Sequence, residues 1–418
     1  MRTQDSRPKI LAFDPKFAMA YAVLGTVYGV LGERTLQIKD TTKAYELRES
    51  ASELEKFYIE SHYYGSVLGD GQKERQLYEL WIQTYPRDGA ALNNLGLIYG
   101  NMGQYEQSIS EFRECIHLSP VGAICYFNLV NAYLALGRLE EARETFEEAE
   151  AKHIDSPWLR VYRYHLAFLQ NDAKGMEEQV AWSSGKPGVE DMFLREEAAT
   201  ASYFGTFNRS RELSQRAMHS AEQVEQRETA AGYGAEAAIR EGLIGNAAES
   251  RKQAMASLRL STGESVKYGA ALALAFAGDA HAESLSSELK RQFPDNVELR
   301  DERLPTIDAL LELHRNHAAK AIEILQSAPY DADDSMVNFM MVYVLRNGYL
   351  AAHRGREASD EFQKILQHPG VLCNDLLFTL SRSGSLVRMP SKTIRETPVQ
   401  PTESSSPCGK TPTPTSPS

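Results

Sequence analysis

Two neighbouring stretches of the sequence repeat one pattern. LNNLGLIYGNMGQYEQSISEFRECIHLSP runs from Leu92 to Pro120, and YFNLVNAYLALGRLEEARETFEEA follows from Tyr126 to Ala149. When they are aligned, every equivalent position in the second stretch lies 34 residues after its counterpart in the first. The equivalent pairs include Gly96 and Val130, Tyr99 and Tyr133, Gly103 and Gly137, and Ser108 and Ala142.

Each repeat has the features of a helical hairpin. Apolar residues recur at spacings of three and four, which predicts helices rather than strands. Gly103 and Gly137 stand where a first helix must end and the backbone commonly needs a positive φ. Pro86 and Pro120 stand after the second helix and prevent it from continuing. Such a hairpin cannot bury its apolar flank alone, so the repetition predicts a stack of hairpins.

The 34-residue period and its pattern resemble those of tetratricopeptide repeat (TPR) proteins. The resemblance implies an all-α fold, a right-handed α-solenoid of about nine or ten TPR-like hairpins. The first helices of the hairpins are then expected to line a concave groove. Four regions are predicted: a remnant of a preceding repeat helix at 1–14, a regular array at 15–150, a degenerate TPR-like array at 151–378 and a disordered tail at 379–418. The register between 151 and 190 is left open.

Four further segments resemble the C-terminal TPR region of bacterial, acidobacterial-type serine/threonine protein kinases. The upstream catalytic motifs of such kinases are absent from this sequence, including the Gly-rich loop, the HRD motif and the DFG motif. Kinase activity is therefore not carried over. The segments are EKFYIESHYYGSVLGD (55–70), YELWIQTYPRDGAALNNLGLIYG (78–100), HLAFLQNDAKGMEEQVAW (165–182) and KAIEILQSAPYD (320–331).

The tail is rich in proline, serine and threonine, and such a composition cannot bury enough apolar surface to order itself. One interpretation is a regulatory tail with Ser-Pro and Thr-Pro sites, and another is a solvated linker. The third, which we favour, is a frameshift between about residues 370 and 397. A helical ending typical of the resembled kinases, read one base late, spells the chain from Val399 to Ser418.

The composition narrows the classes of partner. A net charge of −12 and a pI near 5.4 argue against a nucleic-acid partner, which requires clustered positive charge. No apolar run approaches the roughly 20 residues of a membrane helix, and the N-terminus lacks a secretory signal. We expect a cytoplasmic location, with an extracytoplasmic one as the alternative if the chain belongs to a membrane-anchored kinase. The cysteines are expected to be free thiols in a reducing compartment, with pairing of Cys115 and Cys125 under oxidation as the alternative.

Four asparagines are the candidate peptide-binding residues of the groove. Asn94 and Asn128 are equivalent positions of two repeats, and Asn101 and Asn131 lie about a turn further along their helices. Amide side chains both donate and accept hydrogen bonds, so a ladder of them could hold the backbone of an extended peptide. The alternative is that asparagine is a tolerated polar surface residue there. A clamp for a terminal carboxylate is not predicted, because cations are missing from these positions.

The predicted function is a non-catalytic scaffold that binds a peptide or protein partner in the groove. It would be the docking or sensor region detached from a signalling kinase. The alternative is a self-association module, a homo-oligomer that brings linked enzymes together. No catalytic residue, cofactor or metal site is predicted. His314 and His317 lie three residues apart, but Glu312 is the nearest third ligand and faces elsewhere on the helix.

Overall fold

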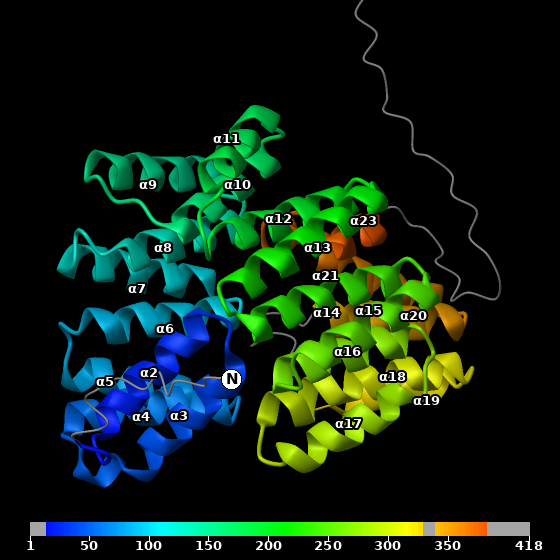
Figure 1. Cartoon of the computed structure of the whole chain (residues 1–418), viewed down its shortest axis with the longest axis horizontal. Coiled ribbons are helices and arrows are strands. Elements are labelled where there is room, and N and C mark those ends of the chain that lie inside the picture. Colours follow the sequence, from blue (N-terminus) through cyan, green and yellow to red (C-terminus); the bar gives the residue numbers. More distant parts are fainter. Residues whose placement is uncertain (1–13, 329–338, 383–418) are drawn as a thin grey trace, which may run out of the picture.

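The computed structural model describes residues 14–328 and 339–382, and all regular structure in these ranges is helical. In these two ranges, ten helical hairpins follow one another (Figure 1). This confirms the predicted all-α solenoid. The hairpins are α2 (Ala18–Val30) with α3 (Arg34–Glu46), α4 (Glu53–His62) with α5 (Gly71–Thr84), α6 (Gly89–Asn101) with α7 (Tyr105–Leu118), α8 (Ala123–Ala135) with α9 (Leu139–Ala151), α10 (Pro157–Leu169) with α11 (Ala173–Ser183), α12 (Glu190–Tyr203) with α13 (Phe207–Gln223), α14 (Arg227–Leu243) with α15 (Ala247–Leu260), α16 (Glu264–Phe276) with α17 (His281–Gln292), α18 (Leu304–His314) with α19 (Ala318–Ser327), and α20 (Phe339–Ala351) with α21 (Gly355–Leu366).

Shorter elements complete the described part of the chain. A 3₁₀ turn, η1 (Arg48–Ser50), precedes α4, and π-helical turns η2 (Tyr63–Val67) and η3 (Leu299–Arg303) extend α4 and precede α18. After α21 come α22 (Pro369–Leu372) and α23 (Leu376–Arg382), so helix continues past residue 379, where the tail was predicted to begin. Residues 1–13 of the predicted remnant at 1–14, and the tail from 383 with its suspected frameshift product, lie outside the described residues.

The 34-residue period continues through the unit whose register the sequence left open. The first helices α6, α8 and α10 begin at Gly89, Ala123 and Pro157, each 34 residues after the previous one. The second helices α7, α9 and α11 keep the same spacing. Residues 157–183 therefore form an ordinary hairpin of the stack, although few of their side chains match the repeat pattern.

Close packing between the two helices of a hairpin requires a small residue on the first helix. A Cβ atom on Gly96 would lie 2.6 Å from the Phe112 ring, which is closer than real Cβ contacts come. The Ser108 hydroxyl donates to the Gly96 carbonyl at 2.7 Å. The same hydrogen bond recurs from Ser210 to the Ala198 carbonyl at 2.8 Å. The degenerate array therefore keeps the helix-to-helix geometry of the regular one.

The turns within the regular hairpins follow the chemistry expected of them. Gly103 and Gly137 have φ angles of 72° and 70°, in the left-handed region that favours glycine. Tyr133 and Ala142 are buried, whereas Tyr99 is half-buried and its hydroxyl donates to Glu79. The glycines thus have two roles: Gly103 and Gly137 allow the turn, and Gly96 allows the close contact between the two helices.

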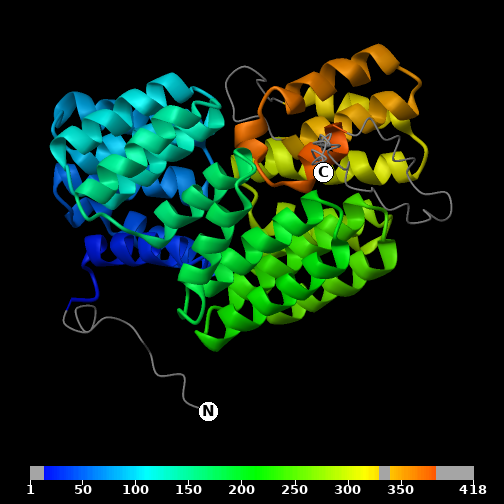
Figure 2. The same cartoon turned by 90° about the horizontal axis from the view of Figure 1, so that it is seen from above.

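The array turns back and contacts itself, which the sequence did not predict (Figures 1 and 2). Helix α3 contacts α16, and the backbone N–H of Val297 donates to the Leu68 carbonyl at 2.7 Å. We call this contact the closure interface: residues 31–35 and 67–69 on one side, and 228–229, 264 and 296–298 on the other. It joins parts of the chain separated by about 200 residues in sequence, for example Thr35 and Glu228, which are 193 apart.

Polar groups dominate the closure interface. The buried carboxylate of Glu264 accepts from Arg34 at 3.1 Å and from Arg303 at 2.9 Å. The carboxylate of Glu228, also buried, accepts from the backbone N–H of Thr35 at 2.9 Å and from its hydroxyl at 3.2 Å. Buried charges are stable only when they are paired and hydrogen-bonded. These carboxylates therefore stabilise the closure interface only while their partners remain in contact with them.

Glu264→Ala tests the closure. The substitution leaves two arginines without their shared acceptor, and we expect the free energy of unfolding to fall by about 3 kcal/mol, as for breaking a buried ion pair. Small-angle X-ray scattering should then show a larger radius of gyration. Glu140→Ala, which removes an exposed pair with Arg143, is the control and should change neither quantity. An unchanged radius and stability for Glu264→Ala would contradict a closed array.

Candidate functional site

One position of each first helix faces away from the helix's own partner. Asn94 lies two residues before Gly96, so on a helix it points to the side opposite the α6–α7 contact. The equivalent positions, each 34 residues further on, are Asn128 on α8, Tyr162 on α10 and Glu196 on α12. We call these four residues the inner strip. Its chemistry changes along the stack from amides to an aromatic ring and then to charge.

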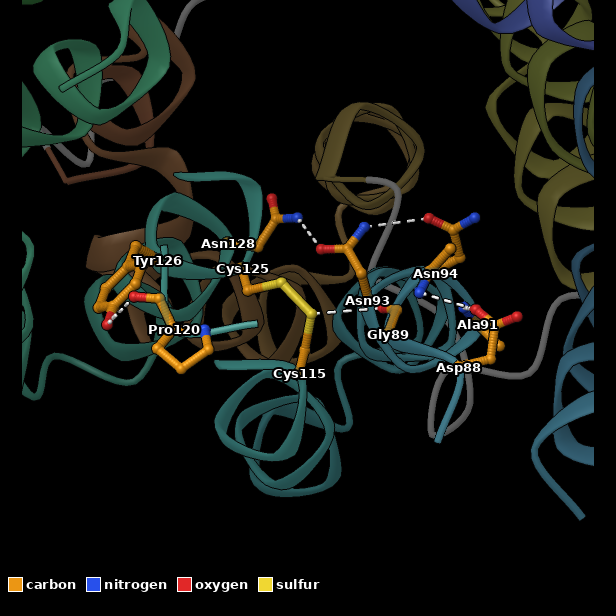
Figure 3. The surroundings of a disulfide bond; sticks show 11 residues. Asp88, Gly89, Ala91, Asn93, Asn94, Cys115, Pro120, Cys125, Tyr126 and Asn128 are labelled. Atoms are coloured by element: carbon orange, nitrogen blue, oxygen red, sulfur yellow. Dashed lines mark hydrogen bonds between the residues drawn. A yellow bond between two sulfur atoms is a disulfide. The ribbon is translucent and has the colours of Figure 1, made fainter. Parts of the chain in front are cut away.

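The two amides of the inner strip belong to a chain of hydrogen bonds that runs through Asn93 (Figure 3). The Asn128 amide donates to Asn93 at 2.8 Å, Asn93 donates to Asn94 at 3.0 Å, and Asn94 donates to the Tyr78 hydroxyl at 2.9 Å. Asn93 and Asn128 are buried and Asn94 is half-buried. Burial raises the pKa of Tyr78 far above its ordinary value, so its hydroxyl stays protonated. Much of the amide capacity is therefore used inside the protein.

The structure brings together only part of the predicted asparagine ladder. Asn94 and Asn128 are linked through Asn93, which was not among the four predicted ladder residues. Asn101 and Asn131 are exposed and take no part in this chain of bonds. A peptide-binding role for the four asparagines stays a prediction.

A disulfide joins Cys115 and Cys125, so the expectation that these cysteines are free thiols is wrong (Figure 3). Cys115 lies near the end of α7 and Cys125 near the start of α8, and their Cα atoms are 6.1 Å apart across the turn between two repeats. Both side chains are buried. The alternative, pairing of Cys115 with Cys125, is the one that the structure shows, because the stacking of one hairpin on the next brings the two side chains together. Cys373 is a buried free thiol, and Cys408 lies outside the described residues.

Reduction of the disulfide should destabilise the junction between the second-helix end and the next repeat. A cross-link that closes so short a loop restricts the unfolded chain by about 2–3 kcal/mol. We expect Cys115→Ala with Cys125→Ala to lower the free energy of unfolding by that amount in urea titrations. Treatment with a thiol reductant should lower the melting temperature of the wild type and leave that of the double variant unchanged. A reductant effect of equal size on both proteins would contradict the pair.

A cluster of charged groups surrounds Glu196 at the far end of the inner strip. His165 on α10 lies 2.8 Å from one carboxylate oxygen of Glu196, and Arg195 donates to the other at 2.8 Å. Arg195 also donates to Glu236 on α14 at 2.8 Å. Burial raises the pKa of Glu196, but His165 and Arg195 outweigh it and lower the pKa to about 2. The carboxylate therefore stays ionised, as a hydrogen-bond acceptor, at any physiological pH.

The lowered pKa of Glu196 predicts how stability depends on pH. A carboxylate with a lower pKa in the folded than in the unfolded chain stabilises the fold above pH 4.5. That contribution is lost as the pH falls from about 4.5 towards 2. We expect Glu196→Gln to cost about 2–3 kcal/mol at pH 7, with the difference from wild type shrinking in acid.

Urea titrations of both proteins between pH 7 and pH 3 check this. Glu197→Gln is the matched control, because burial raises the pKa of Glu197 and its ionised form contributes no such stabilisation. A pH-independent gap between Glu196→Gln and wild type would contradict the assignment.

A segment of the chain itself already lies on this surface. Residues 369–382, here called the docked segment, place α22 against α8 and α23 against α12 (Figure 2). The Asn374 amide donates to the backbone carbonyl of Glu196 at 3.1 Å, to its carboxylate at 3.3 Å and to the Thr200 hydroxyl at 3.0 Å. Residues 369–378 were predicted to end the degenerate array and 379–382 to begin the tail, and this contact with α8 and α12 was not predicted. The signal in the sequence was the segment's run of leucines.

Metal and membrane features can be stated for the described residues. In 14–328 and 339–382, no group of three or more His, Cys, Asp or Glu side chains is placed to hold a metal ion. His314 faces the Phe276 carbonyl at 3.1 Å, whereas His317 lies 2.7 Å from the Glu312 carboxylate, so different neighbours engage the two rings. In the same two ranges, no helix has both the length and the apolar character to cross a bilayer.

Comparison with known proteins supports the hairpin geometry of α6 to α9. Residues 87–152 match the family model of the tetratricopeptide repeat. Proteins built of this repeat generally mediate protein–protein interactions. The matched region holds the two stretches whose repetition predicted the fold.

Several curated proteins are similar to part of the chain. Anaphase-promoting complex subunit 7 of Mus musculus is 30% identical over 153 residues, which cover 34% of this chain and 26% of that protein. Superkiller protein 3 of Schizosaccharomyces pombe is 24% identical over 172 residues, covering 40% of this chain and 12% of that protein. The chain thus spans about a quarter or less of these relatives. The crystal structure of yeast Tom70 aligns over 87% of this chain and 86% of its own, with 14% identity and a TM-score of 0.47.

Proposed function

We propose that the chain is a non-catalytic scaffold that binds a peptide or protein partner on the inner strip and the helix surfaces around it. One observation carries the proposal. This surface already binds a peptide segment, the docked segment, through an amide of Asn374 that reaches both side chains and backbone of α12. A surface that holds one segment in this way has the donors, acceptors and shape to hold another.

The chemistry of the strip favours a peptide over a small molecule. Phe127 on α8 stacks on Tyr162 on α10 with 6.3 Å between ring centroids, which gives a flat apolar platform between the amides and the charges. Beyond it, Arg195 keeps 43% of its side chain exposed beside Glu196 and Glu236. Platform and charges lie on successive first helices, so a ligand that contacts both must be extended along the stack.

The cellular setting of the scaffold rests on sequence resemblance alone. The segments that resemble the repeat region of bacterial serine/threonine kinases support a role as a docking or sensor region detached from a signalling kinase. The relatives reported above are eukaryotic, and they leave the link to a kinase a prediction.

Self-association is the second candidate function. Val23, Val27 and Val30 form an exposed apolar row on α2, with 46%, 46% and 67% of each residue accessible. Exposed apolar surface of this kind is common where proteins associate. A mass that rises with concentration in light scattering of the intact chain would favour this candidate over a monomeric scaffold.

Charge reversal on the strip tests the scaffold. Arg195→Glu places a third carboxylate beside Glu196 and Glu236, and we expect it to weaken capture of a bound partner by about 10-fold, as loss of a strong interface contact does. Arg143→Glu is the control, since Arg143 has a similar exposure of 46% but lies on the second helix α9. Partners are captured with the full chain and quantified by titration, with helicity checked by circular dichroism. Equal weakening by both variants would overturn the proposal.

A further inference from the structure

The docked segment has two chemically different sides. Leu372, Leu376 and Leu377 are buried in the apolar core that α16, α18 and α20 build. The other side meets α8, α10 and α12 through Gly370, the Cys373 thiol and the Asn374 amide. Contact with the inner strip can therefore be lost while the leucines keep the segment attached to its own hairpin.

Two residues fit the docked segment to the surface below it. A Cβ atom on Gly370 would overlap the backbone carbonyl of Leu134 at the end of α8, so only glycine allows this approach. Four residues later, the buried Asn374 amide has three acceptors on α12. The side chain of Val371, between them, packs on the apolar cluster of α7 to α10. Glycine, an apolar residue and asparagine thus define what the surface accepts.

The backbone between these two contacts is strained. Cys373 has a φ of 43° and a ψ of −112°, a conformation that L residues rarely adopt. It links α22 to α23 and is held between the Gly370 contact on one side and the Asn374 hydrogen bonds on the other. Strain of this kind persists only where the surrounding contacts impose it. The docked state is therefore less stable than its contacts alone would make it.

We propose that the surface of α8, α10 and α12 beneath the docked segment is a peptide-binding site that the chain occupies in cis, and that its external ligand is a peptide with the same chemistry. Such a ligand carries a glycine followed four residues later by an asparagine, with apolar residues between them. The inference rests on the proposed scaffold function and specifies its ligand. The docked segment and the external peptide compete for Glu196, Thr200 and the Leu134 carbonyl.

Competition in cis lowers the apparent affinity of any external peptide. A tethered segment is present at a high effective concentration, so it occupies the site most of the time. The external ligand then binds with its intrinsic affinity multiplied by the fraction of open sites. Variants that weaken the cis contact must bind the external peptide more tightly, whereas variants that relieve the strain must bind it less tightly.

A labelled synthetic peptide with the sequence of residues 367–382 is the probe, titrated by fluorescence anisotropy into the full chain. We expect Gly370→Ala to bind it at least about 10-fold more tightly than wild type, because the added methyl group undocks the segment. Gly355→Ala is the matched control, since Gly355 begins α21 and nothing lies within 4 Å of an added Cβ atom there. Asn374→Ala should act as Gly370→Ala does, with Gln363→Ala, an exposed amide on α21, as its control.

Cys373→Gly tests the strain in the opposite direction. Glycine adopts the observed φ and ψ without penalty, which outweighs loss of the 3.9 Å contact between the Cys373 thiol and the His165 carbonyl, so the segment docks more firmly and the probe binds more weakly than to wild type. Hydrogen exchange of residues 369–382 reports docking directly and should be faster in Gly370→Ala and slower in Cys373→Gly. Circular dichroism confirms that each variant keeps its helices.

The outcomes separate this inference from the scaffold function. Equal probe affinity for Gly370→Ala and Gly355→Ala overturns competition in cis. Binding of the probe to both variants would still be consistent with the scaffold function. Failure of every variant to bind the probe also overturns the inference, while the scaffold is judged by partner capture with Arg195→Glu. Tighter binding that survives Thr200→Val in the Gly370→Ala background would place the probe elsewhere and overturn the site.

Discussion

Every hairpin of this chain leaves an apolar flank that only the next hairpin can cover. The two helices of a hairpin contact each other along one face only, where a small residue such as Gly96 lies against a large ring such as Phe112. The remaining apolar side chains of the hairpin form the flank. The covered flanks produce continuous apolar clusters, such as the one that runs from Tyr105 on α7 to Leu166 on α10. Nearest-neighbour burial of this kind makes stability a sum over adjacent pairs, and it fixes the small rotation from one unit to the next.

The rotations add up until distant units meet. After about seven hairpins the array has turned far enough for α16 to contact α3, and the surfaces that meet there are polar. There the carboxylate of Glu264 pairs with Arg34 and Arg303, and the carboxylate of Glu228 accepts from Thr35. Stacking of adjacent hairpins alone would not bring Glu264 to Arg34 or Glu228 to Thr35. Apolar burial therefore builds the array locally, whereas paired charges decide whether it stays closed.

The division between local and distant contacts explains what the sequence could predict. Tyr99 and Tyr133, or Gly103 and Gly137, reveal the period because each pair has the same local task, and the hairpins followed from them. The unit at 157–183 kept the period although its side chains had drifted, because spacing constrains the backbone more than residue identity does. The Cys115–Cys125 disulfide depends on the stacking of one hairpin on the next, and the closure interface on the summed rotation of several. A short stretch of residues determines neither the stacking of one hairpin on the next nor the summed rotation of several hairpins.

The inner strip illustrates the same limit at the level of function. Asparagine at the equivalent positions 94 and 128 led to the prediction of an amide ladder whose free donors and acceptors face an extended peptide. Stacking instead brings Asn93 between them and buries the amide of Asn128. Two repeats later the equivalent position holds Glu196, whose backbone and side chain both accept bonds from Asn374.

The two ends of the strip thus differ in chemistry. At one end the amides hydrogen-bond within the protein, and at the other Glu196 accepts hydrogen bonds from another segment. Because that segment keeps its leucines buried on α16 to α20 and meets the strip through the Asn374 amide and the side chain of Val371, release would expose hydrogen-bonding groups to water and little apolar surface beyond that of Val371. Water can satisfy those groups, so the contact is one that folding can form and a competing peptide can replace.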